Sequence, residues 1–158
     1  MKKSMFAVVL VFVLLVTAFP FMSVAAQEEK TLSFTEDQVN NTFWVTNPRN
    51  RHLSDVFVDL QPGQVTISAT YTKRLNRTGT QTEEHSLSVT LVPSVVNGRV
   101  SWTVTAAMGD GQPASGDLLA QINAHLAASW RRWISSTRPA GRITGVTITD
   151  DAITYTYN

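Results

Sequence analysis

Apolar and polar residues alternate with a period of two in four successive segments of the chain. The alternation is cleanest at residues 65–72, where every second side chain is apolar and the others are Thr or Ser. It recurs at 53–60, 86–92 and 99–108. This period is typical of antiparallel strands that turn one face to a core and the other to water. We therefore predict a four-strand meander with a polar outer face.

The strand at 99–108 is predicted to turn five side chains toward the core. They are Val100, Trp102, Val104, Ala106 and Met108. Trp102 lies in the middle of this strand, so it is expected to be buried, and the next residue, Thr103, is expected to face water.

Residues with special backbone preferences stand where the meander has to turn. Gly63 follows Pro62, the order that a type II turn favours, and the pair Asn97 and Gly98 favours a type I′ hairpin turn. The polar segment 73–84 is expected to form an exposed hairpin tip. These turns support an antiparallel connection between successive strands.

Two segments carry helical signals. Thr35 and Gln38 match the capping box, in which the two side chains satisfy free backbone N–H groups, so a first helix is expected there, ending before Pro48. A longer helix is expected from about residue 115 to 134, where at about 100° per residue the apolar side chains share one wide arc. The arc holds Leu118, Leu119, Ile122, Leu126, Trp130, Trp133 and Ile134.

Two more alternating segments, 143–149 and 152–157, predict a closing hairpin. The apolar phase slips by one residue across Gly145, which predicts a β-bulge. The expected order is helix, four strands, long helix and two strands (α-ββββ-α-ββ), so the fold class is α+β with an antiparallel sheet of about six strands.

The N-terminus has the three parts of a secretory signal peptide. Two lysines precede an apolar run at residues 5–21, Pro20 ends it, and small residues follow. Signal peptidase needs small side chains at the first and third positions before the cut, which Ala26 and Val24 provide. We predict cleavage after Ala26 and a secreted, periplasmic or otherwise extracytoplasmic location. The alternative is a retained membrane anchor, although the run is slightly short of the ~20 apolar residues that span a bilayer.

Chain length and composition predict a single domain without disulfide bonds. Residues 27–158 suffice for one domain with a core of its own. The chain has no Cys, which excludes lipid attachment through that residue. Without the two leader lysines, the domain has 11 basic and 12 acidic residues. This near-neutral balance gives no sign of nucleic-acid binding.

Candidate chemistry is sparse. The three histidines are far apart in the sequence and lack metal-ligand spacing: His52, His85 and His125. A solvated or structurally bonded role is expected for each, and we predict no enzyme activity, no metal and no cofactor. A basic group near the polar hairpin tip could touch anionic headgroups at a membrane surface, although surface solvation explains it equally well. It consists of Lys73, Arg74 and Arg77.

Four segments together resemble small bacterial envelope proteins related to the tubular lipid-binding (TULIP) superfamily. They are residues 32–40, 56–67, 111–126 and 143–157. The resemblance implies a curved antiparallel sheet wrapped around a long amphipathic helix, with an apolar space between them that can hold a lipid tail. It brings no catalytic motif with it.

The aromatic residues are the candidate ligand-binding set under this resemblance. With two aliphatic neighbours on the long helix they are expected to line an apolar groove beneath the sheet. The set is Trp130, Trp133, Leu126, Ile122, Trp102, Phe43 and Trp44. The leading hypothesis is an exported domain that binds an apolar ligand, with lipid as the expected class. The alternative is a structural or protein-interaction envelope domain in which these side chains simply fill the core.

Overall fold

The computed structural model describes residues 28–46 and 51–158. The predicted signal peptide lies outside the described residues. The first helix was expected to end just before Pro48, but it ends at Thr42, where the backbone of Phe43 becomes extended (φ −76°, ψ 132°). No helix among the described residues is long and apolar enough to cross a membrane.

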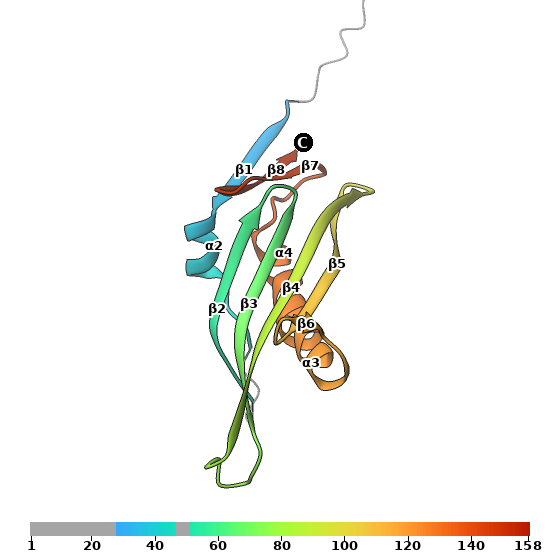
Figure 1. The fold of residues 1–158 in the computed structure, drawn as a ribbon. Helices are drawn as coiled ribbons and strands as arrows, with labels where there is room; N and C mark the ends of the chain where they lie inside the picture. Colours follow the sequence, from blue (N-terminus) through green and yellow to red (C-terminus); the bar gives the residue numbers. More distant parts are fainter. Residues whose placement is uncertain (1–27, 47–50) are drawn as a thin grey trace, which may run out of the picture.

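The predicted meander is confirmed as the larger of two sheets. It consists of β2 (Arg51–Gln61), β3 (Gln64–Arg74), β4 (Thr82–Val96), β5 (Arg99–Gly109) and the short β6 (Gln112–Pro113), paired in that order (Figure 1). The predicted turns have the backbone that they require, with positive φ at Gly63 (78°) and at both Asn97 (52°) and Gly98 (75°). Asp110 and Gly111 also have positive φ and make one further hairpin, which leads into β6.

The two faces of this sheet follow the predicted alternation. Along β3, Val65, Ile67, Ala69 and Tyr71 are buried, while the residues between them are only partly covered. Cross-strand pairs keep the faces separate, since Ile67 pairs with the buried Val89 of β4. The polar pattern of the outer face therefore reflects contact with solvent.

Strand β5 departs from the prediction in its second half. Val104 pairs with Leu91, but Ala106 pairs with Thr90, so a bulge leaves Thr105 without an opposite residue. The bulge reverses the alternation, and Ala106 is exposed. The expectation that Ala106 and Met108 share the inner face with Trp102 is therefore wrong.

A second sheet was not predicted as such. The first element of the described part of the chain is strand β1 (Lys30–Thr35), which pairs antiparallel with β8 (Ala152–Tyr157), and β8 pairs with β7 (Ile143–Ile148). The strands are thus divided between sheets of three and five strands, where we expected one sheet of about six. The predicted bulge in β7 is confirmed by a register shift between Ile143 and Gly145.

Helix α2 (Glu36–Thr42) begins at the predicted capping box. The Gln38 backbone N–H donates to Thr35 Oγ1 at 3.2 Å, and the Thr35 N–H donates to Gln38 Oε1 at 3.0 Å. The Glu36 carboxylate accepts the Leu60 backbone N–H at 2.8 Å, which ties α2 to β2.

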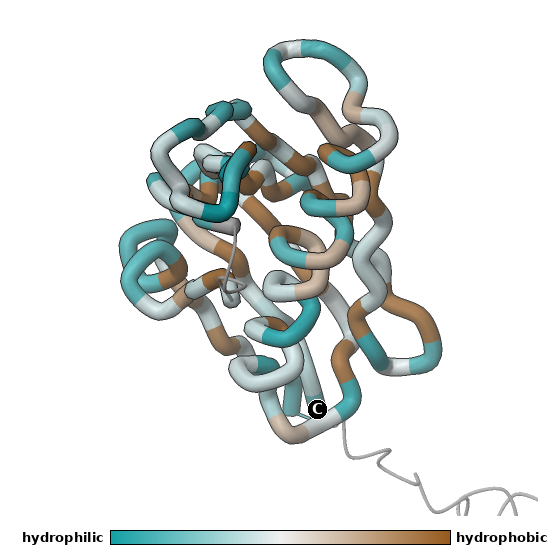
Figure 2. The backbone as a smooth tube through the Cα atoms, turned by 90° about the horizontal axis from the view of Figure 1, so that it is seen from below, coloured by the Kyte–Doolittle hydropathy of each residue, from teal (hydrophilic) through white to brown (hydrophobic). Residues whose placement is uncertain are grey.

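The long helix is confirmed, and it contains a π-helical segment. It runs for 22 residues as α3 (Gly116–Gln121), the π-helix η1 (Ile122–Ala127) and α4 (Ala128–Thr137). It packs on one face of the five-stranded sheet (Figure 1), and brown apolar stretches concentrate in the strands and helical turns at the middle of Figure 2. Gly109 allows this approach, since a Cβ there would lie 2.7 Å from Leu118 Cδ1.

Candidate functional site

An aromatic cluster joins the long helix to the sheet. Trp130 is at its centre and is completely buried. Its ring centroid lies 5.2 Å from that of Trp102, at an interplanar angle of 90°, and 5.8 Å from that of Phe43. Trp133 stacks on Trp130 at 5.1 Å and 20°, and meets Phe34 of β1 edge-on at 5.6 Å. These edge-to-face and offset geometries are those that aromatic pairs prefer.

The structure brings together six of the seven predicted ligand-binding residues. Ile122, Leu126 and Trp130 have no exposed surface, and the other three are nearly covered: Phe43, Trp102 and Trp133. The seventh, Trp44, lies outside the core with 66% of its surface exposed. The six therefore form part of the packed core, whereas Trp44 faces away from it.

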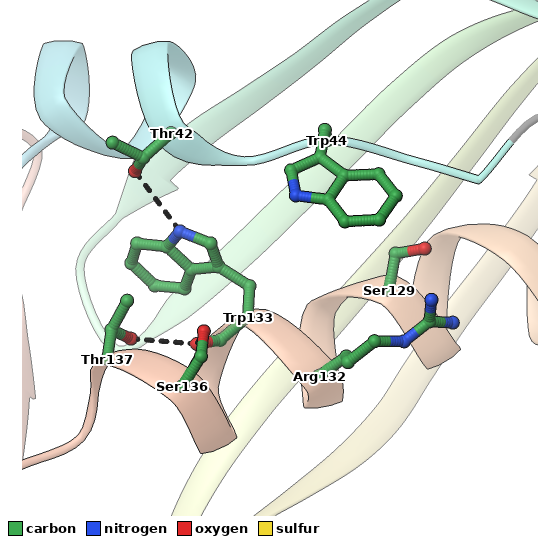
Figure 3. Close-up of a pocket in the computed structure, with 7 residues that line it drawn as sticks. All are labelled: Thr42, Trp44, Ser129, Arg132, Trp133, Ser136 and Thr137. Atoms are coloured by element: carbon green, nitrogen blue, oxygen red, sulfur yellow. Dashed lines mark hydrogen bonds between the residues drawn. The ribbon is translucent and has the colours of Figure 1, made fainter.

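A surface groove runs between Trp44 and helix α4, with a volume of about 430 Å³ (Figure 3). Its lining consists of Thr42, Trp44, Ser129, Arg132, Trp133, Ser136 and Thr137. Of the predicted set, only Trp44 and Trp133 border this groove.

The remaining lining residues were missed because the sequence analysis followed apolar positions. Four polar residues of α4 line the groove, at positions 129, 132, 136 and 137. With Trp133 they are spaced three and four apart, so they share one helix face. That spacing is visible in the sequence, but only the fold places Trp44 opposite to it.

Two side-chain hydrogen bonds hold the walls of the groove together. The Trp133 indole N–H donates to Thr42 Oγ1 at 3.1 Å, which connects α4 to the end of α2 (Figure 3). Arg132 Nη1 donates to Thr46 Oγ1 at 3.1 Å, just beyond Trp44 in the chain. These bonds place both tryptophans along one groove.

The Ser129 hydroxyl is the unusual polar group of this site. Ser129 is only 4% exposed, and its Oγ has no hydrogen-bond partner in the described part of the chain. Ser135, six residues farther along the helix, donates to the Arg131 carbonyl at 2.8 Å, as helical serines commonly do. An unpaired buried hydroxyl costs about 1–3 kcal/mol.

A π-helical segment lies next to Ser129 in the long helix. Segment η1 ends two residues before Ser129, and the Ala128 backbone N–H bonds to the His125 carbonyl. That carbonyl is the usual acceptor, four residues earlier, for a serine at position 129. Ser129 makes no bond to it, and π-helical turns are frequent at functional sites.

The histidine at the predicted hairpin is bonded to its neighbours. His85 Nδ1 lies 2.8 Å from Asp110 Oδ2, Nε2 lies 3.6 Å from Glu83 Oε1, and the ring stacks on Tyr71. The hydrogen bond with His85 lowers the pKa of Asp110. Among residues 28–46 and 51–158, no group of three or more His, Asp or Glu side chains could hold a metal ion.

The predicted basic group is partly neutralised. Lys73 Nζ lies 3.5 Å from Asp117 Oδ2 on α3, and Arg74 Nη2 lies 3.2 Å from His52 Nε2. Arg77 stands at the exposed tip between β3 and β4. A contact of this tip with a membrane surface stays a prediction.

No family model, curated protein or solved structure matches the chain. The resemblance to the TULIP superfamily therefore stays a prediction.

Proposed function

We propose that this protein is an exported, non-enzymatic domain that binds the apolar part of a small ligand in the groove between Trp44 and α4. Lipid is the expected ligand class. The observation that carries the proposal is Trp44, which is 66% exposed and lines the same groove as Trp133. A volume of about 430 Å³ lies within the range of small-molecule sites, about 300–1,000 Å³.

The proposed ligand site differs from the one expected from the sequence, which was an apolar groove beneath the sheet. The groove lies beside α4, and Trp133 connects it to the core because that ring also stacks on the buried Trp130. A bound alkyl chain would cover Trp44 and extend the aromatic cluster outward. The TULIP resemblance, with its sheet curved around a helix, agrees with a lipid ligand and is part of the same proposal.

The alternative is a structural or protein-interaction domain with a filled core and no ligand. The complete burial of Ile122, Leu126 and Trp130 favours it, because tightly packed side chains leave no room for a tail among them. The two functions differ in what would cover the exposed Trp44, which is an apolar ligand in the first and a partner protein or only solvent in the second.

Ligand binding is tested by adding a fatty acid or phospholipid to delipidated protein. Tryptophan emission should shift to the blue, and the melting temperature should rise because the ligand binds only the native state. Trp44→Ala should abolish both effects, whereas Phe57→Ala should preserve them, since Phe57 is exposed on β2 and does not line the groove. Absence of any shift and any stabilisation would favour the filled-core domain.

Export is a separate part of the proposal. It depends on the leader at residues 1–26, which is outside the described residues. N-terminal sequencing of the secreted protein should begin at Gln27. Full-length protein retained in the membrane would contradict this cut and point to the anchor.

A further inference from the structure

We infer that the groove takes an amphiphile with an anionic head, and that Arg132 and Ser129 hold this head while Trp44 and Trp133 cover the chain. The inference rests on the proposed function and names the chemistry of its ligand. The inference depends on two polar side chains of the groove that have unused hydrogen-bond donors.

Arg132 has a positive charge without an acidic partner. Among residues 28–46 and 51–158, the ion pairs involve Lys73 and His85, and none includes Arg132. The guanidinium has five N–H donors, and its hydrogen bond goes to the neutral hydroxyl of Thr46. Its remaining donors can therefore bind a carboxylate or phosphate oxygen at the mouth of the groove.

Ser129 adds a donor that the fold leaves unused. Its hydroxyl is buried at the groove wall and has no partner in the described part of the chain. A buried hydroxyl gains most from a partner that is charged. An anionic oxygen from the ligand would satisfy it and remove the cost of leaving it unpaired.

The two groups are placed to act on one head. Ser129 and Arg132 are three residues apart, so they lie on the same face of α4. In Figure 3 they stand on the side of the helix that faces Trp44, with Trp133 farther along the groove. An alkyl chain lying against the two indoles thus brings its end to a cation and a free hydroxyl.

The experiment compares ligands that share a ten-carbon chain and differ in head. Decanoate, decanol and decyltrimethylammonium are titrated separately into the delipidated protein, followed by tryptophan emission and melting temperature. Acetate and inorganic phosphate are the controls without a chain. We expect decanoate to bind about tenfold more tightly than decanol, the effect of one charge-assisted hydrogen bond of ordinary strength. We expect decyltrimethylammonium to bind more weakly than either.

Variants assign the preference to the two side chains. Arg132→Met should reduce the affinity for decanoate to that for decanol. Arg131→Met is the matched control, because Arg131 is the adjacent exposed cation and does not line the groove, and it should retain the preference. Ser129→Ala should weaken decanoate several-fold, weaken decanol less because an alcohol oxygen is the poorer acceptor, and not lower the melting temperature.

The outcomes separate this inference from the proposed function. Equal affinity of the unaltered protein for decanoate and decanol, or a preference that survives Arg132→Met, would overturn the anionic head while the groove remained a chain-binding site. Failure of all three decyl ligands to bind would remove the proposed function and this inference with it. Acetate or phosphate binding as tightly as decanoate would indicate an anion site without a chain, which contradicts both.

Discussion

Replacing Trp130 by alanine should destabilise the protein more than any substitution in the groove. The indole has no exposed surface and contacts the rings of Phe43, Trp102 and Trp133. Large-to-small aromatic substitutions in cores cost about 3–5 kcal/mol. The Trp130 N–H has no partner in the described part of the chain, so its removal recovers some of that cost. We therefore expect a loss of about 3–4 kcal/mol in the free energy of unfolding.

Urea unfolding followed by far-ultraviolet circular dichroism is the suitable assay, because tryptophan emission changes with the substitution itself. Trp130→Phe should cost about 1 kcal/mol or less, since it keeps an aromatic ring and removes the unpaired N–H. Arg131→Ala, next to it and exposed, should stay within about 0.5 kcal/mol of the unaltered protein. If Trp130→Ala were no more costly than Arg131→Ala, the aromatic cluster would not hold the helix on the sheet.

Three further predictions address the sheets. Trp102→Ala should cost about 3–4 kcal/mol of unfolding free energy, because its N–H is also unpaired in the described part of the chain. The exposed Thr103→Ala should cost well under that, and similar losses would mean that the faces of β5 are misassigned. Burial raises the pKa of the Tyr155 hydroxyl, which has no partner among the described residues, so Tyr155→Phe should leave the melting temperature unchanged or raise it; a clear fall would reveal a hydrogen bond. The lowered pKa of Asp110 contributes stability that is present above its unfolded pKa and is lost as the pH falls through the folded one. Asparagine tolerates the positive φ of 53° at this position, so Asp110→Asn should keep the backbone of the turn. The variant should therefore lose less free energy of unfolding than the unaltered protein when the pH falls below about 4. Parallel profiles of stability against pH for the two proteins would contradict this.

Much of the fold could be predicted because its signals are local. The capping box at Thr35, the hairpin turn at Asn97 and Gly98, and the alternation along β3 each act within a few residues. A turn needs positive φ and a half-buried strand needs alternation, whatever the rest of the chain does. For the same reason, the burial of Trp102 followed from the pattern alone, whereas for Trp130 the pattern left a ligand groove and a filled core as alternatives.

The features that differ from the prediction depend on contacts with residues far away in the sequence. Strand β1 forms because β8 supplies its hydrogen-bond partners, and Ser33 Oγ donates to the Ile153 carbonyl 120 residues away. The bulge in β5 depends on the register with β4. It turns Ala106 from the predicted inner face to the exposed face of the sheet, and the alternation within β5 did not predict this change. Long-range pairing decides these features, so a single segment cannot reveal them.

The candidate site divides in the same way. Helical periodicity alone was enough to predict that the tryptophans of the long helix share an apolar face. No local pattern predicts that Trp44 lies outside the core, across a groove from Arg132 and an unpaired Ser129. The physical reason is that a groove is a relation between surfaces of separate elements, here the end of α2 and one face of α4, and their approach depends on the packing of the whole core.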